Sequence, residues 1–347
     1  MASELQRYFP MIRERQEILQ EINRNWRLSG KFYSWNEHRR EEFLDFCSGA
    51  KGVKMLYDSF FKEILNPEYV PERLNRFLSL LLKKKVKILQ VLPTDSTRLG
   101  DETSLVIMDI VVALEDGSII NIEMQKIGYL FAGERSACYS ADLLLRQYRR
   151  VRDERKQLFK YGDIKPVCTI VLYETSPRQF HEFPKDYLHY ASPQSDTGIE
   201  LNLLQSYLFI SLDIFKNIRQ NNGIRNELEA WLTFLSSDDL ADIIYLTQHF
   251  PAFKAMYQEV YDMCRNMEKV MDMFSEELRI LDQNTVKFMI DEMNDQIKEL
   301  KGRKEQLENE NKELENENTE LQSENTELQS ENEKLRKRIF ELEKCKE

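Results

Sequence analysis

The sequence predicts an α/β fold with a core in the order helix, three strands, helix, strand, followed by a helical C-terminal extension and a parallel coiled coil. Three observations predict it. Apolar residues recur at helical spacing as far as residue 83, and then alternate or form short runs rich in β-forming residues. A helical stripe separates the third of these runs from the fourth. Leucine recurs every seven residues from Leu300 to Leu342.

Four segments follow from this organisation. Residues 1–50 are polar and helical in pattern, with interspersed aromatic residues, and we expect an N-terminal helical arm. The α/β core is expected over residues 51–220, where a strand after a crossover helix implies a parallel pair with a right-handed connection. Residues 221–292 are typical of a helical region, and residues 293–347 of a dimeric coiled coil.

Within the core, two helices (53–66 and 70–83) are expected before the first strand. The expected strands are residues 85–93, 104–114, 119–125, 166–173 and 207–215. Residues 115–118, with the sequence EDGS, are a hairpin turn signal between the second and third strands. A helix is expected over residues 134–152, between the third and fourth strands.

The composition favours a cytoplasmic protein. The five cysteines are odd in number and form no CxxC pair, which argues against a disulfide framework and a structural zinc site. The N-terminus is charged and lacks the apolar segment of a signal peptide. No stretch approaches the roughly 18 apolar residues of a membrane span, so we expect no membrane partner.

The charge is divided unequally along the chain. The net charge is −11, with +4 on residues 1–180 and −15 on residues 181–347. The N-terminal half contains basic clusters at residues 83–87 and 146–155. Such clusters can bind a polyanion such as DNA, but solvated helix faces carry similar runs of charge, and the sequence leaves both interpretations open.

Two acidic residues lie inside predicted strands. Asp109 interrupts an otherwise apolar run, and Glu123 lies between Ile122 and Met124. A buried carboxylate is costly unless it is paired or binds a metal. Because side chains alternate between the faces of a strand, Glu123 and Gln125 share one face, and the hairpin brings Asp109 roughly opposite them. Two carboxylates beside an amide can hold a divalent cation through oxygen ligands, and Mg²⁺ or Mn²⁺ is the expected type.

The same pattern has other interpretations. One face of the sheet can be solvated, or Asp109 can pair with Arg135 in the following helix. Lys126 does not join the acids, because it points to the opposite face of the strand from Glu123.

Several stretches together resemble one protein family. They are the run MDIVVALEDGSIINIEMQ, an arginine and a tyrosine one helical turn apart (Arg135 and Tyr139), the strand PVCTIVLY and the segment DSFFK. In these features the chain is similar to the PD-(D/E)XK nuclease family transposases, the bacterial group that includes the recombination-promoting (Rpn) nucleases. The resemblance covers about residues 50–215. It implies a PD-(D/E)XK-type nuclease core and a bacterial enzyme that acts on DNA.

The resemblance also implies roles for the strand residues. Asp109 and Glu123 match the metal-binding acids of the motif. Gln125 stands where the wider superfamily has a lysine that orients the attacking water. A glutamine, usual in this transposase group, can hydrogen-bond a water but carries no positive charge. Met108 stands where the motif has a proline.

Further candidates lie on the flanking helices. Asp58 or Glu63 on the first core helix is a candidate for an additional carboxylate, as some superfamily members use a helix acid. Arg135 and Tyr139 either contact the scissile or a flanking phosphate, or brace the acids of the sheet.

The C-terminal heptad repeat places leucine at every d position. These residues are Leu300, Leu307, Leu314, Leu321, Leu328, Leu335 and Leu342. Four consecutive a positions hold asparagine, which costs stability but fixes a parallel, in-register pair. We expect a parallel homodimer. The alternatives are a single solvated helix and pairing with a related chain.

Two functions are consistent with the sequence. The first is a metal-dependent DNA endonuclease of the transposase or recombination-promoting type, a hydrolase whose dimer supplies two active sites. The second is a non-catalytic nuclease-fold module that binds DNA or protein and dimerises through its coiled coil, which Gln125 and the acidic C-terminal half favour. A nucleotide enzyme or zinc protease lacks support, because the sequence contains no P-loop glycine pattern and no HExxH spacing.

Overall fold

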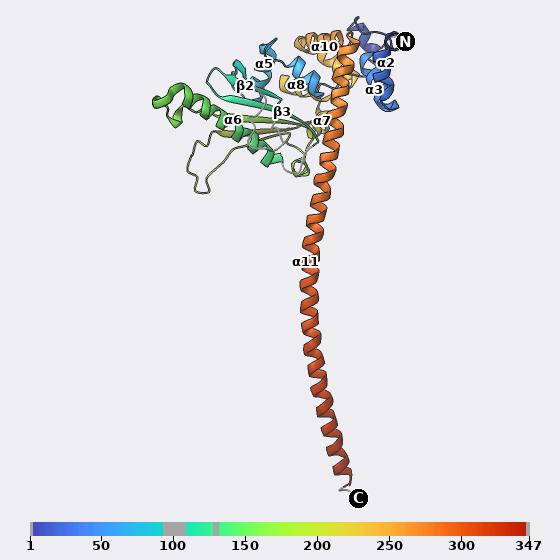
Figure 1. Cartoon of the computed structure of the whole chain (residues 1–347), viewed down its shortest axis with the longest axis vertical. Coiled ribbons are helices and arrows are strands. Elements are labelled where there is room, and N and C mark those ends of the chain that lie inside the picture. Colours follow the sequence, from blue (N-terminus) through green and yellow to red (C-terminus); the bar gives the residue numbers. More distant parts are fainter. Residues whose placement is uncertain (1–2, 93–108, 128–131, 345–347) are drawn as a thin grey trace. The chain divides into compact units, whose positions relative to one another are not determined.

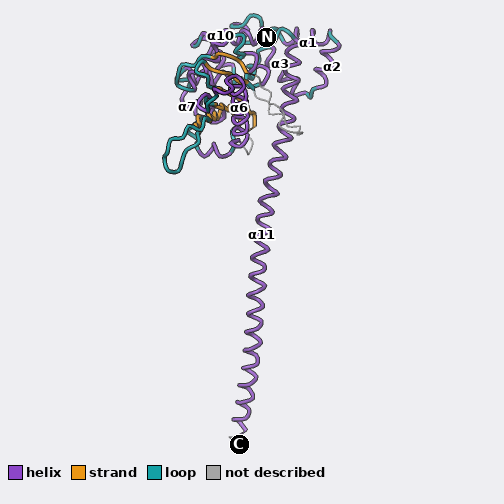
Figure 2. Tube along the Cα trace, turned by 60° about the vertical axis from the view of Figure 1, so that its left-hand side comes forward, coloured by secondary structure: helices purple, strands orange, loops and turns teal. Residues whose placement is uncertain are grey.

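The computed structural model describes residues 3–92, 109–127 and 132–344. The chain divides into two compact units, Met1–Val286 and Lys287–Glu347, and each is described by itself. The first unit contains a six-stranded mixed sheet with helices on both faces (Figure 1). Figure 2 shows the strands in orange, enclosed by the purple helices of this unit.

The helices and strands of the first unit follow the order predicted for the core. The helices are α1 (Arg15–Arg24), α2 (Trp26–Ser34), α3 (Glu37–Cys47), α4 (Asp58–Ile64), α5 (Pro71–Leu81), α6 (Ala132–Arg155), α7 (Leu212–Asn222), α8 (Glu227–Ser236), α9 (Leu240–His249), α10 (Pro251–Met263) and the beginning of α11 (Met267–Lys344). The strands are β1 (Ile88–Leu92), β2 (Ile110–Leu114), β3 (Ile119–Ile127), β4 (Val167–Thr175), β5 (Leu188–Ala191) and β6 (Gln205–Ser211). The helix, three strands, helix, strand order is therefore confirmed as α5, β1, β2, β3, α6, β4.

The sheet is ordered β1-β2-β3-β4-β6-β5. Strands β3, β4 and β6 run parallel to one another, and the remaining neighbours are antiparallel. Helix α6 makes the predicted crossover between β3 and β4 and packs on one face through Tyr139 and Leu143. Helices α5, α8 and α10 belong to the large core on the other face (Figure 1).

The N-terminal helices pack into this large core and do not form a separate arm. Ile18 and Ile22 of α1 are fully buried, and the ring of Phe43 in α3 lies 5.5 Å from that of Phe274 in α11. Residues 1–50 and the helices after residue 220, which were predicted as separate segments, therefore share one compact unit with the α/β core. The aromatic contacts join residues more than 200 positions apart, which a sequence pattern does not show.

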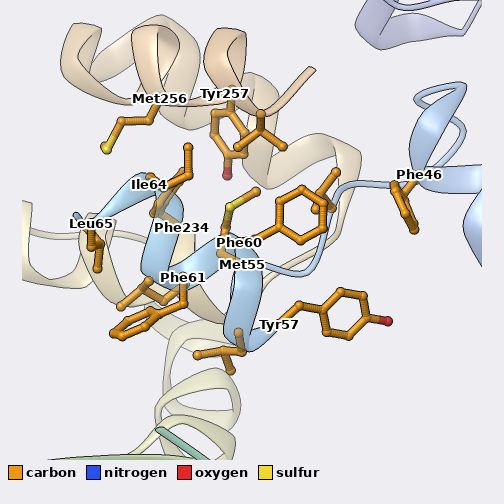
Figure 3. Packing of buried hydrophobic residues seen from close by; sticks show 14 of the residues in the cluster. Phe46, Met55, Tyr57, Phe60, Phe61, Ile64, Leu65, Phe234, Met256 and Tyr257 are labelled. Carbon is orange, nitrogen blue, oxygen red and sulfur yellow. The ribbon is translucent and has the colours of Figure 1, made fainter. Parts of the chain in front are cut away.

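Helix α4 is held by its apolar side. Phe60 and Phe61 are at most 1% exposed, and Figure 3 shows them packed among the side chains of Met55, Phe234 and Tyr257. Burial of an aromatic side chain contributes roughly 1.5–3 kcal/mol, so these two residues fix the polar side of α4 in place.

Two predictions after β4 were wrong in detail. The strand expected over residues 207–215 ends at Ser211, and Leu212 begins α7. Leu212, Ile214 and Phe215 are buried in that helix, so their apolar character suited either kind of element. The edge strand β5 was not among the expected strands. Residues 93 and 104–108 of the predicted strands lie outside the described residues.

The second unit is helical, as the continuation of α11. The heptad leucines from Leu300 to Leu335 are 53–65% exposed on the single chain. The helix is as predicted, and its pairing with a second chain stays a prediction. No helix within the described residues is long and apolar enough to cross a membrane.

Candidate active site

The β2–β3 hairpin places Asp109 opposite Glu123. Gly117, with a φ of +82°, forms the predicted turn, and its N–H donates to the Leu114 carbonyl at 2.9 Å. Ile110 pairs with Ile122 in the antiparallel register, so Asp109 falls beside Glu123. The Asp109 Oδ2 atom accepts a hydrogen bond from the Met124 N–H at 2.7 Å, which ties this carboxylate to β3.

Glu123 is buried and Asp109 is largely buried, and the charge of Asp109 disfavours the charged form of Glu123. The Asp109 side chain is 15% exposed and Glu123 is 2% exposed. Burial raises the pKa of Asp109 to about 6, the charge of Asp58 adds to this rise, and Lys62 opposes it. Burial also raises the pKa of Glu123 well above its usual range, and the charge of Asp109 raises it further. A cation bound between the two carboxylates would stabilise their charged forms, so the pair favours cation binding.

Helix α4 adds an acid and a cation to the site. The Lys62 Nζ atom lies 3.0 Å from Asp58 Oδ2 and 3.2 Å from Asp109 Oδ1, so it bridges the two carboxylates. Burial lowers the pKa of Lys62, but the charges of Asp109 and Asp58 outweigh burial and raise it above its ordinary value. The ammonium therefore keeps its charge at neutral pH.

Glu63, the other candidate on α4, does not reach the site. Its carboxylate forms an ion pair with Lys269 of α11 at 2.6 Å. It lines a surface pocket together with Ile64 and Tyr69. Glu63 follows Lys62 in the helix and so points about 100° away from it, which explains why only Asp58 comes near the sheet acids.

Helix α6 contributes Arg135 and Tyr139 on the Glu123 face of the sheet. The Arg135 guanidinium carbon lies 5.2 Å from the centroid of the Tyr139 ring, within the range of a cation–π contact. The charge of Arg135 opposes the rise in the pKa of Glu123. Burial raises the pKa of Tyr139 to about 12, so the phenol stays neutral. The two residues are near enough to act on Glu123 electrostatically.

Gln125 lies on the same face as Glu123, as predicted. It is 4% exposed, and neither atom of its amide has a hydrogen-bond partner among the described residues. Lys126 points to the opposite face, where its ammonium lies 4.4 Å from the Tyr57 ring centroid and forms an ion pair with Glu277 of α11. Lys126 is therefore not a substitute for a lysine at position 125.

The polar groups of this site fit a hard divalent ion. Glu123 Oε1 is buried without a hydrogen-bond partner in the described part of the chain, and so is the amide oxygen of Gln125. The described residues contain no group of three or more His, Cys, Asp or Glu side chains arranged to hold a metal. Asp109 and Glu123 thus offer two carboxylates, the pattern of Mg²⁺ sites that complete their coordination with waters and substrate phosphate.

A family model of PD-(D/E)XK nuclease family transposases matches residues 55–292. The chain belongs to this family. Comparisons with curated proteins and with solved structures find no match. The family region of this PD-(D/E)XK protein begins just before α4 and includes the start of α11, so it is longer at its C-terminal end than the resemblance seen in the sequence.

Two residues of this PD-(D/E)XK protein that contact the site or its supports were not among the candidates predicted from the sequence. Lys62 lies four residues after Asp58, a spacing that places both on one side of a helix, and this signal was present in the segment DSFFK. Glu277 accepts a hydrogen bond from the Asp58 N–H at 2.8 Å and pairs with Lys126. No local pattern marks Glu277, because its partners lie on distant parts of the chain.

Proposed function

We propose that this protein is a metal-dependent DNA endonuclease of the transposase or recombination-promoting type. In this proposal Asp109 and Glu123 bind Mg²⁺ or Mn²⁺, and the enzyme hydrolyses phosphodiester bonds in the bacterial cytoplasm. One observation carries it: the carboxylate of Asp109, just before β2 and 15% exposed, lies beside the buried carboxylate of Glu123 in β3, which has an oxygen without a hydrogen-bond partner among the described residues.

The residues of the site have distinct tasks in this reaction. A bound divalent ion supplies a Lewis acid and lowers the pKa of water. Asp109 and Glu123 hold it, and the buried Gln125 amide can accept a hydrogen bond from the attacking water and fix its position. Arg135 of α6 would contact a phosphate oxygen. Asp58 orients the ammonium of Lys62 at 3.0 Å.

Plasmid cleavage tests the proposal. Purified wild-type protein should nick or cut supercoiled plasmid with Mg²⁺ or Mn²⁺, and Asp109→Ala and Glu123→Ala should not. Equal cleavage by the wild type and both variants would exclude this site as the source of the activity.

A non-catalytic role is the second candidate, because Gln125 replaces the charged residue of the PD-(D/E)XK motif. A protein of this kind would bind DNA in a salt-sensitive manner, would not be stabilised by Mg²⁺, and would not cleave. The same plasmid assay combined with a Mg²⁺ thermal shift separates the two functions.

The stabilisation of the protein by Mg²⁺ should depend on pH. Without metal, the raised pKa of Asp109 lets the folded state hold a proton that the unfolded state has lost. This contribution to stability is present below the unfolded pKa and is lost as the pH rises to about 6. Above that pH the charged acids repel each other, and below it protons compete with the ion. We therefore expect Mg²⁺ to raise the Tm more at about pH 7.5 than at about pH 5.

Differential scanning fluorimetry at the two pH values measures this difference. Asp109→Asn is the control, since it removes both the titration and one ligand, and its shift with Mg²⁺ should be small throughout. A wild-type shift of the same size at both pH values would contradict the prediction.

We propose in addition that residues 293–344 pair with a second copy as a parallel coiled coil. The regular stripe of half-exposed leucines supports pairing, and asparagine at four a positions limits its strength. Deleting residues 293–347 should leave a folded core that binds DNA no worse but dimerises less. Sedimentation at several concentrations measures the change. A truncated chain that stays fully dimeric would show that the leucine stripe is dispensable for assembly.

A further inference from the structure

One cation beside the strand acids comes from helix α4. Lys62 Nζ is within 3.2 Å of Asp109 Oδ1 and within 3.0 Å of Asp58 Oδ2. Its side chain is 37% exposed, whereas that of Asp109 is 15% exposed. Lys62 therefore extends from the buried carboxylates to the solvent edge, where a DNA phosphate would approach.

The strand itself offers no such charge at this place. The motif of the wider PD-(D/E)XK superfamily ends in lysine, and this chain has Gln125 at that position. The next residue, Lys126, is on the other face of the sheet and is engaged by Glu277 and the Tyr57 ring. A positive charge on the Glu123 side of the hairpin must therefore come from a neighbouring element.

Helix α4 is anchored in the core and can supply this positive charge. Phe60 and Phe61 anchor the helix in the large core, and the Asp58 N–H is held by Glu277. The Lys62 ammonium lies between the carboxylates of Asp58 and Asp109. An anchored, charged ammonium beside a metal-binding carboxylate is pre-organised to act on negative charge that develops in a reaction.

We propose that Lys62 is a catalytic residue that contacts a non-bridging oxygen of the scissile phosphate and supplies the charge that Gln125 lacks. The inference rests on the proposed nuclease function. In the hydrolysis, the oxygen of water bonds to phosphorus as one phosphorus–oxygen ester bond breaks. The proton of water goes to the leaving oxygen, so the products are a phosphate monoester and a hydroxyl. Lys62 transfers no proton and only stabilises the added negative charge.

Substitution of Lys62 in the full-length protein tests this role. With plasmid DNA and saturating Mg²⁺, Lys62→Met should lower the cleavage rate by about 10²- to 10³-fold, the usual cost of losing one such electrostatic contact. Lys62→Arg should keep more of the rate. Lys269→Met is the matched control, because it removes a cation that pairs with α4 through Glu63, outside the site.

Relocating the charge makes the test specific. Adding Gln125→Lys to Lys62→Met should recover at least about tenfold of the lost rate, because the new lysine stands on the same face as Glu123. A residue that only neutralised Asp58 would not be replaced by a lysine on β3.

Titration with Mg²⁺ alone, in a calorimeter, gives a readout independent of cleavage. Lys62→Met should bind Mg²⁺ at least as tightly as the wild type, because a competing ammonium is removed from Asp109. Weaker binding would overturn the inference, since Lys62 would then only arrange the acids. Wild-type cleavage rates in Lys62→Met would overturn it as well. A wild type that cleaves nothing would instead overturn the proposed function, and the inference with it.

Discussion

Replacing Glu123 with glutamine should remove metal-dependent cleavage without destabilising the fold. A bound divalent ion stabilises the transition state by several kcal/mol. Each 1.36 kcal/mol is a factor of ten in rate, so we expect Glu123→Gln to slow plasmid cleavage by at least about 10³-fold. The loss should be larger than that expected for Lys62→Met, because the acid holds the ion itself.

The stability of this variant separates a functional acid from a structural one. Burial and the charge of Asp109 hold the pKa of Glu123 well above its usual range, so the metal-free protein favours the neutral acid. Glutamine has the shape of that neutral acid, and it places no second negative charge beside Asp109. The free energy of unfolding at neutral pH should therefore stay within about 0.5 kcal/mol of the wild-type value or rise.

Urea denaturation and plasmid cleavage on the same samples measure the two quantities. Glu115→Gln is the matched control, since Glu115 lies in the turn of the same hairpin and pairs with Lys87 at the surface. It should alter neither cleavage nor stability appreciably. A Glu123→Gln variant that unfolds readily, or that cleaves at the wild-type rate, would show that Glu123 is not a ligand in an otherwise intact site.

The part of this site that was predictable from the sequence is local. Side-chain alternation and a short turn fix which residues of β2 and β3 share a face, so Asp109, Glu123 and Gln125 could be placed together from pattern alone. The position of Asp58 was also within reach, because it lies on the same helix as the segment that resembles the family.

The remaining contacts depend on the packing of distant elements. Lys62 meets Asp109 only because α4 packs by its phenylalanines against a core built partly from α8 and α10. Glu63, one residue on, is turned toward Lys269 instead, and helical periodicity alone does not decide which side faces the sheet. The predicted end of the last strand at residue 215 was wrong for a similar reason. Apolar residues such as Phe215 are buried equally well in a strand or in a helix.

The buried pair of Lys126 and Glu277 should have the largest effect on stability. Glu277 is fully buried, and Lys126 is 7% exposed. Removing one partner of such a pair leaves an uncompensated charge in the interior, which typically costs 3–5 kcal/mol. We expect Glu277→Gln to lower the free energy of unfolding by about this amount in urea denaturation. Glutamine still offers an oxygen to the Asp58 N–H, so the loss reports mainly on the charge.

A matched control and a double variant define this effect. Glu259→Gln breaks the partly exposed pair with Arg73 and should cost no more than about 1 kcal/mol. Combining Lys126→Met with Glu277→Gln should recover most of the loss, because no charge is then left unpaired. A Glu277→Gln variant as stable as Glu259→Gln would show that the buried pair does not hold α11 against β3.

The pH dependence of the Glu277→Gln variant follows from the lysine left behind. Burial already lowers the pKa of Lys126 to about 7 in the wild type, and the loss of the Glu277 charge should lower it further. In the pH range between the lowered folded value and the ordinary unfolded value, the unfolded state binds a proton that the folded state does not. Stability of the variant must therefore rise with pH over that range. We expect its deficit relative to the wild type to be smaller at about pH 7.5 than at about pH 5, because over that range the folded wild type still holds a proton that the folded variant has lost. A deficit that does not shrink would mean that the loss does not come from the charge of Lys126.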